Sequence, residues 1–214
     1  MHSTPNNSSF TYRCIIDLYA RAAATLYGII HFDDFYRILD TYYGGGILSN
    51  ERIMAYFWFS KNDDPIYYTQ DELIVHASIP PDEIVRTLSV IQPPAKIMAP
   101  RYYNILPEKD FLMYAFPGYY EESLGMQRME EYLADGLGLS WEDAREIVAE
   151  MVFVCRTGSS STFIMDTLSR RDLLTGMENE LDLILMGIEI EAGTRQWARL
   201  GASVREMVGG VISP

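Results

Sequence analysis

Basic residues, and lysine above all, are scarce in this sequence. Its 214 residues hold 17 Lys and Arg, only three of them lysines, against 30 Asp and Glu, for a formal net charge of −13. Such a surface repels phosphate, which disfavours sequence-independent binding of nucleic acid. Residues 1–100 carry 7 basic and 11 acidic side chains, and residues 101–214 carry 10 and 19. If the chain binds phosphate at all, we expect the first half to do so.

Cysteine and histidine are equally scarce, which removes the usual metal ligands. Cys14 and Cys155 form no CxxC pair, and His2, His31 and His76 show no i, i+4 spacing. A structural zinc site and a disulfide framework are therefore not expected. We predict no metal and no cofactor, and we expect both cysteines to be reduced, buried thiols.

Long apolar runs are absent as well. No stretch reaches the roughly 18 apolar residues of a membrane-spanning helix, and the opening MHSTPNNSSF has no cationic segment followed by an apolar one. We predict a cytoplasmic protein without membrane contact and with a disordered head over residues 1–10. A hydrophobic content of 48% is enough to build a buried core in the rest of the chain.

Three helices are predicted before residue 60. RCIIDLYARAAATLYG has apolar residues at helical spacing and stops at Gly28, a natural C-cap residue. A second helix, in FDDFYRILDTYY, ends at the glycines 44–46, and a third begins after Ser49 or Asn50. We place four of its apolar residues on one face: Ile53, Met54, Phe57 and Trp58.

The apolar period then changes from about 3.6 to about 2. Two strands, 66–69 and 73–78, are predicted around a polar turn at 70–72. Three helices followed by a hairpin is the order of a winged helix-turn-helix, and other small helix-plus-hairpin packings share it. We predict a winged-helix-like module over residues 11–79.

Six prolines mark the segment that follows. They lie within residues 80–107, around one short helix at 82–90, and proline disrupts both helix interiors and sheets. We predict a proline-rich connector over 80–107 and, because every later pattern is helical, a helical domain over 108–214. The expected fold class is mainly helical α+β, with a winged-helix-like N-terminal module and a C-terminal helical domain.

Motifs for catalysis are missing. RTGSSSTF lacks the GxxxxGK[ST] pattern of a phosphate loop, and no GxSxG marks a nucleophile. The acidic pairs at 33–34, 63–64 and 71–72 are interpreted as solvated caps and turns rather than magnesium ligands. No catalytic residue is nominated, and a non-enzymatic protein is expected.

Aromatic residues make up 13% of the chain, and many tyrosines come in pairs. Neighbouring residues point in different directions, so at least one tyrosine of each pair is expected to reach a surface. Exposed tyrosine favours protein interfaces, and the alternative is that these rings cover the joint between the two halves. The candidate interaction residues are these tyrosines and the single cation of the third helix: Tyr42, Tyr43, Arg52, Tyr67, Tyr68, Tyr102, Tyr103, Tyr119 and Tyr120.

Residues 192–201, AGTRQWARLG, place two arginines around Trp197. Arg195 and Arg199 fit one face near the C-terminal end of a helix that stops at Gly201, where cations suit the helix dipole. We interpret the stretch as a helix end with a half-buried Trp197. Arg195 is predicted to act in stability rather than in binding.

The same stretch resembles a segment, NNTRxWxNRGxTPxEL, of uncharacterised bacterial proteins that often end in a SEC-C zinc-binding tail. Thr194, Arg195, Trp197 and Gly201 are the matching positions, whereas Arg199 is offset by one. Residues 18–30, LYARAAATLYGII, and 106–114, LPEKDFLMY, resemble that group's LYARAAANLYGII and IPEKDEFLKY. The cysteine-rich tail is missing here, so the resemblance implies a fold outline without zinc, and the group has no settled activity.

These features favour an intracellular interaction or regulatory protein, of bacterial or phage origin, that acts through protein contacts. The alternative is an acidic inhibitor that mimics nucleic acid and blocks a nuclease or a phage-defence complex, such as an anti-CRISPR. A second alternative is a winged-helix DNA-binding regulator, although Glu51 partly offsets Arg52 on the predicted recognition helix. The expected partner is therefore a protein, with nucleic acid disfavoured by charge.

Overall fold

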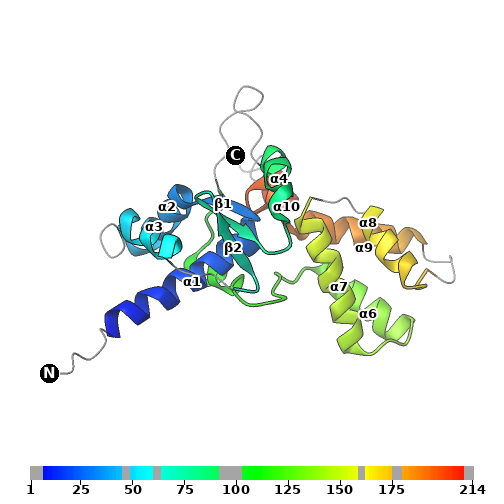
Figure 1. Cartoon of the computed structure of the whole chain (residues 1–214). Helices are drawn as coiled ribbons and strands as arrows, with labels where there is room; N and C mark the ends of the chain where they lie inside the picture. Colours follow the sequence, from blue (N-terminus) through cyan, green and yellow to red (C-terminus); the bar gives the residue numbers. More distant parts are fainter. Residues whose placement is uncertain are drawn as a thin grey trace. The chain divides into compact units, whose positions relative to one another are not determined.

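The chain folds as two compact units, Met1–Tyr119 and Tyr120–Pro214. The computed structural model describes residues 7–44, 49–59, 64–91, 103–158, 162–174 and 180–209 (Figure 1). Both units are mainly helical and each has a small antiparallel sheet, which confirms the expected α+β class. In the part of the chain described, no helix is long and apolar enough to cross a membrane.

Unit 1 packs its helices against a three-stranded antiparallel sheet. Its elements are, in chain order, α1 (Asn7–Tyr27), β1 (Ile29–His31), α2 (Phe32–Tyr43), α3 (Asn50–Phe59), β2 (Tyr67–Gln70), β3 (Leu73–His76), the 3₁₀ turn η1 (Pro81–Glu83), α4 (Ile84–Ile91) and α5 (Glu108–Met113). The strand order is β1-β3-β2, with Ile30 and Thr69 both opposite Ile74. The last strand to appear in the sequence is thus the central one.

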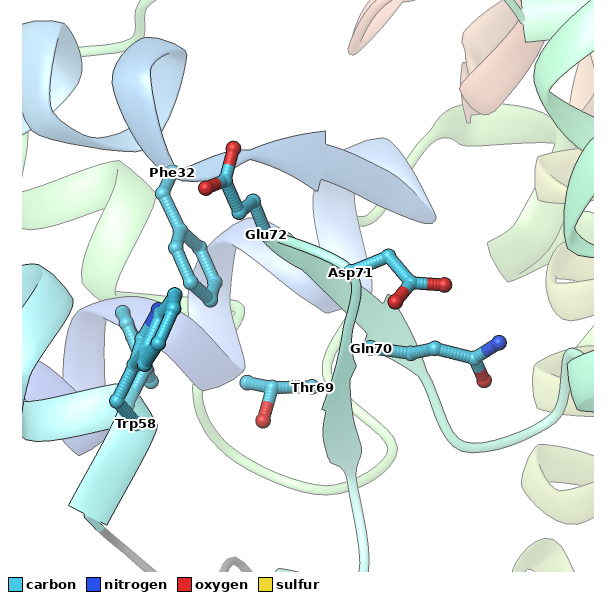
Figure 2. Close-up of a pocket in the computed structure, with 7 residues that line it drawn as sticks. Phe32, Trp58, Thr69, Gln70, Asp71 and Glu72 are labelled. Carbon is cyan, nitrogen blue, oxygen red and sulfur yellow. The ribbon is translucent and has the colours of Figure 1, made fainter.

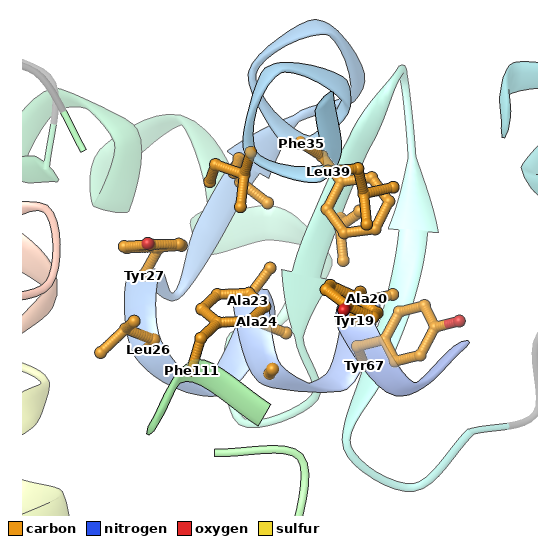
Figure 3. Close-up of a cluster of buried hydrophobic side chains, with 14 of the residues drawn as sticks. Tyr19, Ala20, Ala23, Ala24, Leu26, Tyr27, Phe35, Leu39, Tyr67 and Phe111 are labelled. Atoms are coloured by element: carbon orange, nitrogen blue, oxygen red, sulfur yellow. The ribbon is translucent and has the colours of Figure 1, made fainter. Parts of the chain in front are cut away.

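Helix α1 forms the centre of the unit 1 core (Figure 3). Ala20, Ala23 and Ala24 on this helix are completely buried, and their small side chains let neighbouring elements approach closely. Larger rings fill the space around them, and the Tyr19 ring lies 5.8 Å from that of Phe111 on α5. Helix α5 therefore belongs to this core.

Glycines end the first two helices where the sequence predicts. Gly28 (φ 76°) follows α1 and Gly44 (φ 62°) follows α2, both in the left-handed conformation that glycine adopts at low cost. The hairpin strands and α4 lie close to their predicted positions. Strand β1 is not predicted, because the three residues of IIH become a strand only through pairing with β3, more than forty residues later.

The domain limits differ from those expected from sequence. Phe111 and Tyr114 are buried in the unit 1 core, so this unit continues to Tyr119 rather than ending before residue 108. Helix α1 begins at Asn7, within the predicted disordered head, and residues 1–6 lie outside the described residues. Residues 92–102 of the predicted connector also lie outside them.

Unit 2 is a helical bundle with a two-stranded ribbon near its end. Its elements are α6 (Leu124–Glu131), the short π-helix η2 (Tyr132–Gly136), α7 (Trp141–Arg156), α8 (Thr162–Arg170), α9 (Glu180–Gly193), β4 (Arg195–Gln196), the 3₁₀ turn η4 (Trp197–Arg199), β5 (Ala202–Ser203) and α10 (Val204–Gly209). Helices α6 and α9 touch at Gly125, where a Cβ atom would lie 2.5 Å from the Cβ of Glu189. Methionines 126, 129, 151 and 186 fill the core between the helices.

The two cysteines have different environments. Cys155 on α7 is buried as expected, and burial raises the pKa of its thiol to about 12. The expectation that Cys14 is buried is wrong, because it lies on an exposed face of α1. Of the two cysteine thiols, only that of Cys14 is therefore accessible to solvent in the folded chain.

Candidate functional site

Helix α3 presents one buried face and one exposed face. Ile53 and Phe57 are buried, whereas Trp58 is 69% exposed and Phe59 is 88% exposed. The prediction that Trp58 shares the face of Ile53 and Phe57 is wrong. Each helical residue is rotated by about 100° from the last, so Trp58 points away from the core that its neighbour Phe57 enters.

The exposed face of α3 has few charges. It consists of one acidic, one basic and three apolar residues, Glu51, Arg52, Ala55, Trp58 and Phe59, spaced at three and four along the helix. The predicted interaction residue Arg52 therefore lies on the same exposed surface as the two aromatic rings. Adjacent exposed aromatic side chains are unusual on a soluble protein and are typical of contact surfaces.

A pocket of about 460 Å³ adjoins this face. It is lined by residues from the start of α2, the end of α3 and the β2–β3 turn: Phe32, Phe57, Trp58, Thr69, Gln70, Asp71 and Glu72. The buried rings of Phe32 and Phe57 stack at 4.8 Å, with an angle of 19° between their planes. Figure 2 shows the Phe32 and Trp58 side chains on one side of the pocket, and Asp71 and Gln70 on the other. The site thus has an aromatic side and a polar side.

The polar side is a two-residue turn in an uncommon conformation. Asp71 (φ 48°) and Glu72 (φ 63°) both adopt the left-handed region, where Asn and Gly are normally preferred in tight hairpins. The Glu72 carbonyl accepts a hydrogen bond from the Phe32 backbone N–H at 2.9 Å, which fixes the turn against the start of α2. Figure 2 shows the Glu72 side chain on the Phe32 side of the turn, and Asp71 and Gln70 on the other.

Sequence reasoning did not nominate this pocket. Phe32, Trp58 and the acidic pair Asp71-Glu72 lie in three separate segments, and the acidic pair is interpreted from sequence as a solvated turn. The detectable feature was the aromatic run YFWF at 56–59, which is too rich in rings for all of them to fit one buried helix face.

The predicted tyrosines of α2 and the hairpin use their hydroxyls inside unit 1. Tyr42 donates to the Leu106 carbonyl at 2.8 Å, and Tyr68 donates to that of Ile79 at 2.7 Å. Tyr67 is completely buried and donates to Asp17 at 2.7 Å. Burial, followed by the charge of a nearby carboxylate, raises the pKa of both Tyr42 and Tyr68. These three side chains support the fold.

The other described tyrosines are also at least half-buried. Tyr43 accepts a hydrogen bond from Tyr19 at 3.1 Å, and the rings of Tyr103 and Tyr119 make edge contacts of 4.8 and 5.1 Å with Tyr27 and Tyr114. In unit 2, Tyr120 donates to Glu130 at 3.0 Å, and burial and this bond raise its pKa.

Tyr102 lies outside the described residues. In the tyrosine pairs, as far as the structure describes them, every side chain is partly or fully buried. A direct role of these tyrosines in a partner interface stays a prediction.

The C-terminal motif is a strand and turn, not a helix end. Helix α9 stops at Gly193, Arg195 lies in β4 opposite Ser203, and residues 197–199 form a 3₁₀ turn. The prediction of one helical face carrying Arg195 and Arg199 is therefore wrong. Helix α9 ends eight residues before Gly201, and the Thr194 hydroxyl caps it by donating to the Ile190 carbonyl at 2.7 Å.

Two motif residues fix the turn that follows. Trp197 is buried rather than half-buried, and its ring makes an edge contact of 6.2 Å with Phe153. Gly201 adopts φ 82°, directly after Leu200 at φ 51°, and its N–H bonds the Gln196 carbonyl at 3.1 Å. The left-handed pair reverses the chain into β5, which sequence periodicity alone does not reveal.

Arg195 connects three segments of unit 2. Its guanidinium donates to both Glu206 oxygens at 2.7 Å, to Glu121 at 2.9 Å and to the Gly201 carbonyl at 3.0 Å. Glu206 also accepts from the Ser203 N–H at 2.9 Å, while the Ser203 hydroxyl accepts from the Glu206 N–H at 3.2 Å, which is a capping box at the start of α10.

Both charged groups are stabilised by this arrangement. Burial alone lowers the pKa of Arg195, but the hydrogen bonds of Glu121 and Glu206 raise it overall. Burial alone raises the pKa of Glu206, and the Ser203 N–H and the Arg195 guanidinium bring it below its ordinary value. The motif therefore acts as a structural clamp.

The surface of unit 2 carries much of the excess acid. Residues 120–214 hold 17 acidic side chains and 8 arginines. Several arginines are in ion pairs, including Arg145 with Glu130 at 3.7 Å and Arg171 with Glu150 at 2.7 Å. The exposed carboxylates include Glu122, Glu131, Asp135, Glu142, Glu146, Asp166, Asp172 and Asp182. In the part of the chain that the structure describes, no group of His, Cys, Asp and Glu is arranged to hold a metal ion.

Comparison with known protein families finds no matching family. Comparisons with curated proteins and with solved structures find no match either. The resemblance to the SEC-C-tailed group therefore stays a prediction.

Proposed function

We propose that this chain is a non-enzymatic protein-binding module that contacts its partner through the exposed face of α3 and the pocket beside it. The observation that carries the proposal is the exposure of Trp58 and Phe59, at 69% and 88%, next to an open pocket. Large aromatic side chains that fit a partner's pocket dominate the energy of many protein interfaces. An adjoining pocket lets the surface also accept a side chain of the partner.

The order of unit 1 supports a winged helix-turn-helix as the scaffold of this module. Along the chain, unit 1 has a helix, a strand, two helices and a hairpin, and its strands lie in the order β1-β3-β2. A winged helix-turn-helix has the same sequence of elements and the same strand order. Helix α3 then takes the place of the recognition helix and the β2–β3 turn that of the wing. The recognition position exposes Trp58 and Phe59, and the wing tip carries Asp71 and Glu72, which repel phosphate. We infer that the scaffold serves protein rather than DNA.

A second candidate function, an acidic inhibitor that mimics nucleic acid, is favoured by unit 2. Its 17 acidic side chains outnumber its 8 arginines, and such a surface can occupy a phosphate-binding channel of a nuclease or defence complex. This function requires the carboxylates of unit 2 and not the aromatic face of α3. The two candidates can therefore be separated by substitution.

Affinity capture from bacterial lysate, with half of each sample treated with nuclease, tests the proposal. We expect a distinct protein to be retained in both halves by the wild type, and lost when Trp58→Ala and Phe59→Ala are combined. The matched control is Val85→Ala with Val90→Ala, which removes exposed apolar side chains of α4 in the same unit. Loss only on neutralising Glu142 and Glu146 would support the inhibitor instead, and recovery of nucleic acid would support a DNA reader.

A further inference from the structure

We infer that the pocket beside Trp58 receives the guanidinium group of an arginine side chain from the partner. This inference rests on the proposed function, since the arginine belongs to the protein that docks on α3. It goes further in assigning the ligand a charge, a shape and a set of contacting residues.

The aromatic side of the pocket suits a flat cation. Phe32 and Phe57 form a stacked pair, and the exposed Trp58 lines the same side of the pocket (Figure 2). The face of an indole or phenyl ring attracts a cation within ~6 Å of its centre, and tryptophan does so most strongly. A guanidinium also stacks on such rings through its own plane, which the ammonium of lysine cannot do.

The polar side of the pocket has the matching charge. Asp71 and Glu72 are its ionisable residues and both are acidic, and the Glu72 side chain lies on the Phe32 side of the turn (Figure 2). An anionic ligand would be repelled there, and an apolar one would remove water from the carboxylates without replacing its hydrogen bonds. Arginine supplies five N–H donors in a planar fork, which can bond the Glu72 carboxylate while the plane lies on the rings.

The backbone of the turn is strained. Two consecutive non-glycine residues in the left-handed region are unfavourable, and Asn-Gly would make the same turn with less strain. Strained backbone that persists in a structure is concentrated at binding sites.

The probe is Nα-acetyl-arginine methylamide, added to the full-length ¹⁵N-labelled chain while the indole N–H resonances are recorded. We expect a saturable shift of the Trp58 signal. The neutral citrulline analogue should leave it unmoved, and the lysine analogue should bind more weakly. Trp141 is an internal control, because it is also exposed and adjoins the acidic pair Glu142 and Asp143 but does not line the Trp58 pocket. The inference is overturned if Trp58 does not shift, or if Trp141 shifts as much as Trp58. It is also overturned if the citrulline analogue shifts Trp58 as much as the arginine analogue does, or if the lysine analogue binds more tightly than the arginine analogue.

The double variant Asp71→Asn with Glu72→Gly separates charge from folding. It removes both carboxylates and gives the turn its preferred residues, so the chain should fold at least as well while the arginine-dependent shift is lost. A shift that survives in this variant would also overturn the inference. The proposed function is tested by a separate experiment, the affinity capture of a partner protein. If capture depends on Trp58 but the arginine analogue does not bind, only the inference about arginine fails. If the analogue binds but capture does not depend on Trp58, only the proposed function fails.

Discussion

Replacement of Arg195 by alanine is expected to destabilise unit 2 severely. The side chain is 9% exposed, and its guanidinium makes four hydrogen bonds that join the start of the unit at Glu121, the turn at Gly201 and helix α10 at Glu206. Alanine removes the cation and leaves two carboxylates and a carbonyl without their donor.

The magnitude follows from the exposure of the partners. Breaking a buried ion pair on one side costs about 3–5 kcal/mol, because the remaining charge stays buried without a counter-ion. Glu121 and Glu206 are 35% and 42% exposed, so water can partly replace the lost donors. We therefore expect a loss of about 2–3 kcal/mol, which lowers the unfolding midpoint of a unit of this size by roughly 10–20 °C.

Thermal unfolding followed by the fluorescence of buried Trp197 measures this loss. The matched control is Arg205→Ala, which removes an exposed arginine from α10 in the same segment. Arg195→Lys should recover less than half of the lost stability, since lysine keeps the charge but not the two-pronged bond to Glu206. If Arg195→Ala and Arg205→Ala unfold at the same temperature, the assignment of Arg195 to a structural clamp is refuted.

The same clamp predicts a dependence on acid. Because the pKa of Glu206 is lowered by folding, its contribution to stability is present above the ordinary carboxyl pKa of 4.5 and is lost as the pH falls through the lower folded value. Glu206→Gln should remove this part of the pH profile while leaving a less stable chain at neutral pH. An unchanged acid profile in this variant would contradict the role given to Glu206.

Three further predictions concern packing, thiols and the hairpin. Gly125→Ala should destabilise unit 2 by about 1–3 kcal/mol in a denaturant titration, because the new Cβ would collide with that of Glu189. Gly187→Ala on α9 is the control: its Cβ meets only ordinary contacts, so the change should be neutral or stabilising. A thiol reagent at neutral pH should label one cysteine in the folded chain and two in denaturant, and Cys14→Ser should abolish the labelling of the folded chain. Two labelled thiols under native conditions would contradict the burial of Cys155. Asp71→Asn with Glu72→Gly should raise the free energy of unfolding by about 1 kcal/mol by relieving the left-handed turn, and a decrease would show that the turn is not strained.

Local signals in the sequence were enough to place much of unit 1. Apolar spacing with a terminal glycine predicts α1 and α2, and alternation around a polar turn predicts the hairpin. Strand β1 escaped prediction because its partner is β3, and no pattern within three residues records a distant pairing. Helix α5 was assigned to the wrong half for a related reason, since burial of Phe111 against α1 is a tertiary contact.

The site was harder to predict than the fold. Trp58 is exposed whereas its neighbour Phe57 is buried, and the helical phase of a short aromatic run is ambiguous from sequence. At the C-terminal motif, the spacing of Arg195 and Arg199 matches a helix equally well. The helix instead ends at Gly193, before both arginines, and the left-handed conformation of Leu200, a residue that rarely adopts it, turns the chain from β4 towards β5.

The most direct test of protein binding through α3 is a comparison of dissociation constants for the captured partner. Isothermal titration would measure the partner against the wild type, the Trp58→Ala and Phe59→Ala double variant, and the Val85→Ala and Val90→Ala double variant. We predict that the first variant weakens binding by about tenfold or more, as expected for aromatic anchors, and that the second leaves it unchanged. Equal dissociation constants for the two variants would contradict the claim that α3 is the docking surface.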